Sequence, residues 1–168
     1  MNRVFLLLGG NLGNVAETFE QARQLVLLRI GDITAVSSLY QSEPWGFSSC
    51  ELFLNQVLEL TTQLGPNELL QVLLEIESSM GRTRQAGLIT SRPIDIDILF
   101  YNDQVVVLPQ LEIPHPRLHL RRFTLLPLAE LAPEMIHPLF AQTVAQLLEE
   151  CNDPLAVTKL TIAENTAG

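Results

Sequence analysis

Two aspartates lie two positions apart in a run that otherwise has the composition of a buried strand. The run RPIDIDILFYN spans residues 92–102 and contains Asp95 and Asp97 between isoleucines. Successive side chains of a strand point to opposite faces, so the two carboxylates share a face, with Cα atoms roughly 6.5–7 Å apart. We expect Leu99 and Tyr101 on that face too. The opposite, core face is predicted to hold Ile94, Ile96, Ile98 and Phe100.

Two carboxylates this close on a half-buried strand require a positive partner. Like charges this close repel each other, and both lose solvation on burial. A divalent metal ion or an arginine would meet this requirement. Oxygen ligands favour Mg²⁺, which keeps waters and shares substrate phosphates, and two ions ~3.5–4 Å apart would also suit bridging carboxylates. The D-x-D pattern alone leaves a metal site and a structural Asp–Arg network both open.

An arginine cluster surrounds this run in an otherwise acidic chain. Six of the ten basic residues lie between positions 82 and 122, and all six are arginine: Arg82, Arg84, Arg92, Arg117, Arg121 and Arg122. The planar guanidinium suits bidentate phosphate contacts. The first three flank a polar segment at 85–91, and a flexible loop with arginines at its base would suit closure over a phosphate substrate. We therefore favour this function over a simple interaction with a helix dipole.

Three further groups of residues could take part in a site. Phe53 and Asn55 share a strand face, where a ring and an amide could stack on and hydrogen-bond to a flat heterocycle. His115 is expected to contact a phosphate or leaving group; a zinc site with His119 is disfavoured, because Pro116 lies between them and no third ligand is evident. The turn GGNLGN lacks the Gly-Lys-Ser/Thr of a P-loop and is interpreted as a tight strand-to-helix turn.

The elements that position these residues follow from apolar periodicity and from turn residues. Asn14 is predicted to cap a first helix that ends at Gly31, and Gly65-Pro66 to open a second that ends at Gly81. A third helix is expected at 143–151, and the chain from 159 onward is expected to be loose. Strands are predicted at 3–8, 33–40, 53–62, the aspartate run, its hairpin partner 105–108 and 123–126. The order βαββαβ favours an α+β ferredoxin-like sandwich, a mostly antiparallel sheet covered by helices.

Composition favours one globular domain. The chain has 168 residues, of which 47% are hydrophobic, and its net charge is -9. We expect a single catalytic domain over residues 1–160 and a loose tail at 161–168. The acidic balance argues against a nucleic-acid partner, and no run reaches the ~20 apolar residues of a membrane span. Two cysteines far apart in sequence do not indicate a disulfide framework, so we expect a cytoplasmic protein. We also expect a monomer.

The motifs, taken together and in order, resemble a known enzyme family. GGNLGN, SEPWG, FLN, GRTR, SRPIDIDILFYN and IPHPRLHLRRFTLLPLAELAP, within residues 4–133, are similar to those of the 6-hydroxymethyl-7,8-dihydropterin pyrophosphokinases of folate biosynthesis. The resemblance implies a ferredoxin-like fold and transfer of pyrophosphate from ATP to the hydroxymethyl group of the pterin, with release of AMP. It also implies two Mg²⁺ ions.

The resemblance assigns roles to individual residues. It implies that Asp95 and Asp97 hold the metal ions and that Arg82 and Arg92 contact the reacting phosphates. The nucleotide side is implied to include Glu77, Arg84, Ile98, His115 and Arg121. The pterin side is implied to include Ser42, Pro44, Trp45, Phe53, Asn55 and Phe123, with the two phenylalanines sandwiching the ring and Asn55 bonding its edge.

Local departures from the family pattern leave other functions to be weighed. The segment GLITSR at 87–92 lacks the tryptophan and proline that often precede the aspartate strand, Gly10 replaces a serine, and Ser42 replaces a threonine. One alternative is a non-catalytic ferredoxin-like nucleotide- or metal-binding module with aspartates paired to arginines. Another is a metal-dependent phosphohydrolase. No strong general base is evident, and one of the aspartates or a metal-bound hydroxide could serve.

Overall fold

A computed structural model describes residues 1–11, 13–42, 52–81 and 93–160. Its main sheet has the strand order β5-β1-β4-β3-β8, and β2 also pairs with β4. All of these pairings are antiparallel. The strands of this sheet are β1 (Asn2–Gly10), β2 (Gly31–Val36), β3 (Tyr40–Ser42), β4 (Phe53–Thr62), β5 (Asp95–Tyr101) and β8 (Val157–Lys159). The order around β1 and β4 confirms the expected ferredoxin-like βαββαβ arrangement.

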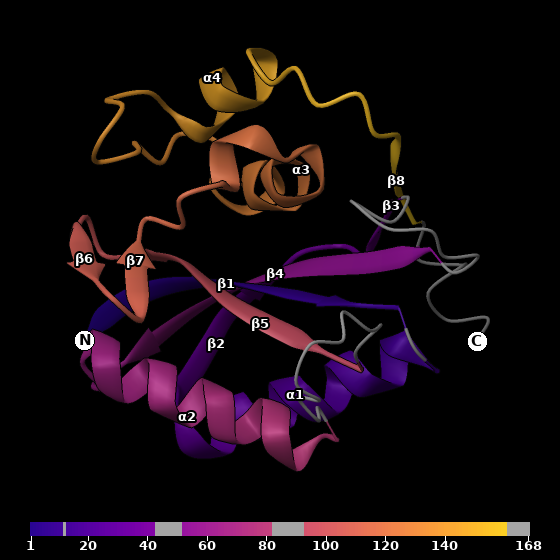
Figure 1. Cartoon of the computed structure of the whole chain (residues 1–168), viewed down its shortest axis with the longest axis vertical. Helices are drawn as coiled ribbons and strands as arrows, with labels where there is room; N and C mark the ends of the chain where they lie inside the picture. Colours follow the sequence, from indigo (N-terminus) through magenta and orange to yellow (C-terminus); the bar gives the residue numbers. More distant parts are fainter. Residues whose placement is uncertain (12, 43–51, 82–92, 161–168) are drawn as a thin grey trace.

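Helices cover both faces of the sheet (Figure 1). One layer contains α1 (Val15–Arg29) and α2 (Pro66–Ser79), and the opposite layer contains α3 (Arg122–Leu131) and α4 (Val144–Glu149). A 3-10 turn, η1 (Leu118–Leu120), precedes α3. Within the described residues, no helix combines the length and the apolar character needed to cross a membrane.

The sheet separates two apolar cores, because alternate residues of each strand enter different cores. Residues Val4, Leu6 and Leu8 of β1 pack towards α1 and α2, whereas Phe5 and Leu7 belong to the second core with residues of α3 and α4. Residues paired across strands enter the same core: Leu58, the partner of Leu6, belongs to the first core, and Val57, the partner of Leu7, belongs to the second. This second face carries the aspartates, so the functional side chains share a layer with α3.

Helix ends agree with the predicted signals. Asn14 Oδ1 accepts a hydrogen bond of 3.1 Å from the Glu17 N–H, which confirms the predicted cap of α1. Pro66 begins α2, and Gly81, with φ 93°, follows its end. Thr143 caps α4 through its bond from the Gln146 N–H.

The aspartate strand contains a bulge that the sequence pattern did not reveal. Leu6 pairs with Ile98 but Phe5 pairs with Phe100, so Leu99 is the extra residue of β5. The alternation therefore changes after Ile98: Phe100 packs in the core on the side of the aspartates, and Tyr101 packs in the core beneath α1 and α2. The predicted faces of Phe100 and Tyr101 were wrong, while Asp95 and Asp97 share a face as predicted.

Four other predictions of elements need correction. The strand predicted at 33–40 is divided into β2 and β3, and at the break Ser37 Oγ accepts the Val57 N–H at 2.9 Å. The segment 105–108 does not pair with β5; β6 (Val106–Leu108) pairs with β7 (Leu111–Ile113). The strand predicted at 123–126 is part of α3. The chain predicted to be loose from 159 onward begins with a paired residue, because Lys159 of β8 pairs with Tyr40 of β3.

The misassignment of α3 has a simple physical reason. The short run FTLL is apolar and partly β-branched, and such a run does not distinguish a strand from a buried helix. Only the longer spacing of Thr124, Leu125 and Leu128, all buried against the second face of the sheet, reveals helical periodicity.

Candidate active site

One row of residues crosses the sheet on the face covered by α3. Asp95 of β5 is in register with Gly9 of β1, Gly9 with Asn55 of β4, and Asn55 with Tyr40 of β3. Paired residues of neighbouring strands point to the same face. With strands ~4.8 Å apart, Asp95 and Asn55 are about 10 Å apart at the backbone, and Gly9, which has no side chain, lies between them. The carboxylates and the amide therefore lie on two sides of a bare stretch of backbone.

Gly9 leaves room for the Asn55 side chain. A Cβ atom at Gly9 would lie 2.9 Å from Asn55 Nδ2, closer than such contacts occur in proteins. The same Nδ2 donates a long hydrogen bond, 3.4 Å, to the Leu8 carbonyl. Asn55 is 5% exposed, so its amide extends over β1 towards the aspartate strand.

The two aspartates lie at an edge of the main sheet. Both are partly exposed, and β5 is the terminal strand of the sheet. Between them, the Ile96 N–H donates a 2.8 Å hydrogen bond to Glu77 Oε2 of α2, a carboxylate only 4% exposed. Glu77 therefore holds the backbone between Asp95 and Asp97. Glu77, which the resemblance assigns to the nucleotide side, thus lies behind the aspartate strand and contacts its backbone.

Ile98 is separated from the aspartates by the sheet. Its side chain is buried in the core beneath α1 and α2. Because alternate N–H groups of a strand point the same way, the Ile98 N–H is expected at the open edge with that of Ile96. Contact of Ile98 with a nucleotide would therefore have to involve its backbone.

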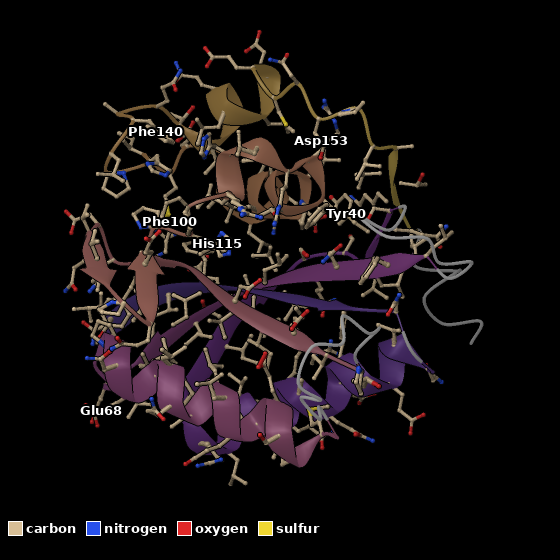
Figure 2. All side chains as sticks on the ribbon, in the orientation of Figure 1. Tyr40, Glu68, Phe100, His115, Phe140 and Asp153 are labelled. Atoms are coloured by element: carbon tan, nitrogen blue, oxygen red, sulfur yellow. The ribbon has the colours of Figure 1, made fainter. Side chains whose placement is uncertain are left out.

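His115 lies between β5 and α3 (Figure 2). Its N–H donates to the Leu99 carbonyl, 3.0 Å, at the bulge of β5. Its Nδ1 accepts the Arg117 N–H at 3.1 Å, so the neutral ring carries its proton on Nε2. Burial, together with the positive charges of Arg121 and Arg117, lowers the pKa of His115 to about 4. The imidazole is therefore neutral at neutral pH.

Arg121 and Phe123 lie where η1 leads into α3. The Arg121 guanidinium carbon is 5.5 Å from the centre of the Phe123 ring, a cation–π contact. Burial lowers the pKa of Arg121, as does Arg117, whereas Asp97 and Asp153 raise it. Asp97 of the aspartate strand is therefore close enough to favour the charged form of Arg121.

The remaining pterin-side residues are divided between described and undescribed segments. Ser42 is 3% exposed and pairs with Phe53 across β3 and β4, in register next to the Tyr40–Asn55 pair. Phe53 is partly exposed on the same strand face as Asn55. Five predicted site residues lie outside the described residues: Pro44, Trp45, Arg82, Arg84 and Arg92.

Sequence reasoning assigned no role to the three residues that join α3 to this region, Glu130, Tyr40 and Ser38. Glu130 Oε1 accepts a 2.7 Å hydrogen bond from the Tyr40 hydroxyl, and its Oε2 accepts the Ser38 N–H at 2.9 Å. Glu130 is the one charged residue in the run FTLLPLAEL at 123–131. That isolated charge was the available signal, but its partners lie about ninety residues away in the chain.

The arrangement defines a class of protein: a ferredoxin-like α+β chain with paired carboxylates next to a ring–amide pair. The family model described as 7,8-dihydro-6-hydroxymethylpterin-pyrophosphokinase (HPPK) matches residues 5–133. The chain belongs to this family. Its function is therefore that of a pterin pyrophosphokinase of folate biosynthesis, and the non-catalytic alternative is not favoured.

Several curated relatives share one name, and each is similar to this chain over most of its length. A 2-amino-4-hydroxy-6-hydroxymethyldihydropteridine pyrophosphokinase of Porphyromonas gingivalis is 40% identical over 138 residues, which covers 80% of this chain and 93% of that protein. Its counterpart in Aquifex aeolicus is 35% identical and covers 89% and 92% of the two chains. The one in Bacillus subtilis is 37% identical and covers 80% of each.

A solved structure supports the fold. The wild-type HPPK-DHPS of Plasmodium falciparum aligns with a TM-score of 0.72 at 20% identity, over 89% of this chain. The aligned part is 43% of the Plasmodium chain. At this identity the likeness shows the fold alone.

Proposed function

We propose that this chain transfers the pyrophosphate group of ATP to 6-hydroxymethyl-7,8-dihydropterin and that Asp95 and Asp97 hold two Mg²⁺ ions in that reaction. The observation that carries the proposal is the row Asp95–Gly9–Asn55. It lies on one face of the sheet and has a carboxylate side for metal and phosphate and an amide side for a heterocycle. ATP and the pterin are then small-molecule substrates of one continuous site.

The carboxylate pair suits Mg²⁺ in its chemistry. Both groups are hard oxygen donors on a partly exposed edge strand. Among the described residues, no cluster of three or more His, Cys, Asp or Glu side chains could hold a metal. Two protein ligands are sufficient for Mg²⁺, which completes its shell with water and phosphate oxygens. When bound, the ions would neutralise the charge of the triphosphate.

Protein groups on the nucleotide side would contribute charge and hydrogen bonds. Arg121 is suited to contact a phosphate. It is partly buried, its guanidinium lies over the Phe123 ring, and the charge of Asp97 favours its charged form. His115, neutral with its proton on Nε2, would donate a hydrogen bond to a phosphate oxygen rather than supply a charge. Arg82, Arg84 and Arg92 are proposed as further phosphate contacts.

The pterin would lie between aromatic rings. Phe53 of β4 and Phe123 of α3 are on the same side of the sheet, and Asn55 supplies donors and acceptors for the edge of the ring. Ser42 lies next to this pair in register. Pro44 and Trp45 are proposed to complete the pocket.

The reaction requires mainly alignment and charge neutralisation. The hydroxymethyl oxygen of the pterin forms a bond to the β-phosphorus of ATP, the bond from that phosphorus to the α,β-bridging oxygen breaks, and AMP leaves. The hydroxyl proton must pass to a base. On the carboxylate side of the described site, Asp95 and Asp97 are the groups that could accept it.

An assay of AMP formation tests the proposal. We expect AMP from ATP only when the pterin is present, loss of activity with EDTA, and recovery on addition of Mg²⁺. Asp97→Ala should lower kcat/KM by about 100-fold or more, as loss of a charged transition-state contact does. Asp103→Ala, which removes an exposed carboxylate of the turn after β5, is the matched control and should leave the rate unchanged.

Other products would contradict the proposal. ADP or phosphate in place of AMP would retain a phosphate site but exclude pyrophosphate transfer. Full activity of Asp97→Ala would remove this carboxylate from the site.

A further inference from the structure

A polar contact joins α3 to β3 and to the residues just before it, beside the proposed pterin site. The Glu130 carboxylate accepts the Tyr40 hydroxyl at 2.7 Å, the Ser38 N–H at 2.9 Å and the Ser38 hydroxyl at 3.3 Å. Lys159 Nζ of β8 lies 3.6 Å from the same carboxylate. Tyr40 of β3 is 5% exposed and lies on the side of the sheet that α3 covers (Figure 2). We call the Glu130–Tyr40–Ser38 group the clamp.

The clamp connects residues that line the two sides of the proposed pterin pocket. Glu130 follows Phe123 by seven positions in α3, two helical turns, so both side chains lie on one face of the helix. Tyr40 is in register with Asn55, and its strand neighbour Ser42 is in register with Phe53. One hydrogen bond therefore fixes the helix that carries one ring relative to the strands that carry the other.

The free-energy cost of burying the Glu130 carboxylate indicates that this residue does more than pack α3 against the sheet. Glu130 occupies an otherwise apolar run and is only partly exposed, and burying a charge is unfavourable unless it is paired. Burial raises the pKa of Glu130, but hydrogen bonds from Tyr40 and Ser38 and the charge of Lys159 lower it further, so the net pKa is below the usual value. An apolar residue would pack α3 at less cost, whereas a satisfied carboxylate defines one position of the helix.

Sandwiching a flat ring requires such a defined position. Two rings that stack on both faces of a pterin must lie about 7 Å apart, twice a carbon–carbon contact, and a gap of ~0.5–1 Å forfeits a quarter to a half of the attraction. The apolar core under α3 contains residues of β1, β4 and β5 but none of β3. The clamp acts at the β3 side.

We infer that Glu130, through Tyr40 and Ser38, is a positioning residue that sets the spacing between α3 and the strands β3 and β4 and thereby the affinity for the pterin. This rests on the proposed function. Among the described residues, the contacts of Glu130 involve none of the proposed nucleotide-side groups, so we expect the effect of the clamp to be confined to the pterin.

Tyr40→Phe is the direct test, and Tyr101→Phe is its matched control. Tyr101 is 2% exposed, and its hydroxyl donates a 2.6 Å hydrogen bond to the Leu64 carbonyl in the core beneath α2. Each substitution removes one buried tyrosine hydroxyl and keeps the ring. We expect Tyr40→Phe to raise the KM for the pterin about fivefold to tenfold, with the KM for ATP within about twofold, and Tyr101→Phe to alter neither.

A second pair of variants separates positioning from general stability. Glu130→Gln keeps an acceptor for the Tyr40 hydroxyl, so it should retain a lower pterin KM than Glu130→Ala. The double variant Tyr40→Phe/Glu130→Ala should be no worse than Glu130→Ala alone, because both changes break one contact.

Two outcomes would overturn the inference. Equal effects of Tyr40→Phe and Tyr101→Phe on the pterin KM would reduce the clamp to a structural hydrogen bond. A parallel rise in the KM for both substrates would do the same. If wild-type protein formed no pterin-dependent AMP, the proposed function would fail first, so the two failures are distinguishable.

Discussion

At the scale of single residues, Gly9 separates the carboxylates from the ring–amide pair. Asp95 and Asn55 lie on either side of it in register, and the Asn55 amide extends into the space above its Cα atom. The close approach of Asn55 Nδ2 to that space shows that a side chain at position 9 would compete with the amide. A small residue at this position is thus part of the site without carrying any functional group.

Gly9→Ala should therefore act on the pterin through Asn55. The new Cβ displaces the Asn55 amide, which is the mobile end of a side chain, so the fold should tolerate the change. We expect the KM for the pterin to rise about tenfold, the equivalent of one lost hydrogen bond, with the KM for ATP nearly unchanged. Steady-state kinetics of AMP release measures both.

A double variant provides the control for this prediction. If the alanine acts by displacing the amide, then Gly9→Ala should cause no further loss in an Asn55→Ala background. An additive loss would show that Gly9 affects the site by another route.

At the scale of elements, the direct passage from α1 into β2 places the outer strands. Ile30 caps the helix, and Gly31 already begins β2, in register with Thr62 of β4. Thr62 Oγ1 donates a 2.8 Å hydrogen bond to the Ile30 carbonyl. With no loop between helix and strand, the backbone of β2 has to lie against β4 from its first residue.

Gly31→Ala should disturb this junction strongly. A Cβ at Gly31 would lie 1.9 Å from the Thr61 carbonyl oxygen, which is backbone and has no alternative rotamer. We expect the free energy of unfolding to fall by about 2–3 kcal/mol, the upper range for overpacking. Gly65→Ala is the control, because the nearest atom to its Cβ is 3.5 Å away, and urea unfolding of the two should differ by more than about 1 kcal/mol. Equal midpoints would contradict the packing argument.

At the scale of the whole molecule, stability depends on a histidine outside the site. His137 is 2% exposed, and its Nδ1 accepts the N–H groups of Leu139 and Phe140 at 3.1 and 3.3 Å. Its ring stacks on Phe140 and meets the edge of Phe100 from β5. The chain after α3 is thus joined to the core of the sheet by a neutral imidazole.

Mild acid should therefore weaken the fold. Burial and the nearby His119 lower the pKa of His137 from 6.5 to about 4. The folded state then binds fewer protons than the unfolded chain, so the contribution is complete above about pH 6.5 and is lost as the pH falls towards 4. Between pH 7 and pH 5 this residue should cost about 2 kcal/mol of unfolding free energy.

Urea unfolding of the wild type and of His137→Asn at both pH values tests this dependence. Asparagine keeps an acceptor for the two N–H groups but does not titrate. The variant should lose about 2 kcal/mol less than the wild type on going from pH 7 to pH 5, since other titrating groups cancel in the comparison. Equal losses in the two proteins would show that His137 is not the group responsible.

Features decided by local pattern were predictable from the sequence, and features decided by distant partners were not. Asp95 and Asp97 share a face because a two-residue period is a local property. The exchange of Phe100 and Tyr101 arises from a bulge that depends on pairing with β1. Likewise, no local pattern in residues 123–131 indicates that Glu130 meets Tyr40. The sequence motifs, taken together, identified the family. The contacts that position the site residues became visible only in the structure.

The pairing of β8 with β3 has a consequence for synthesis of the chain. During translation, β1 to β5 are complete more than fifty residues before Val157 to Lys159 emerge. Until then the outer edge of β3 has no strand beside it, and an unpaired edge is a template for association with other chains. A nascent chain thus completes its carboxylate pair early but closes the Tyr40 edge of its sheet last. Ribosome-bound intermediates of this protein should be most prone to aggregate through that edge.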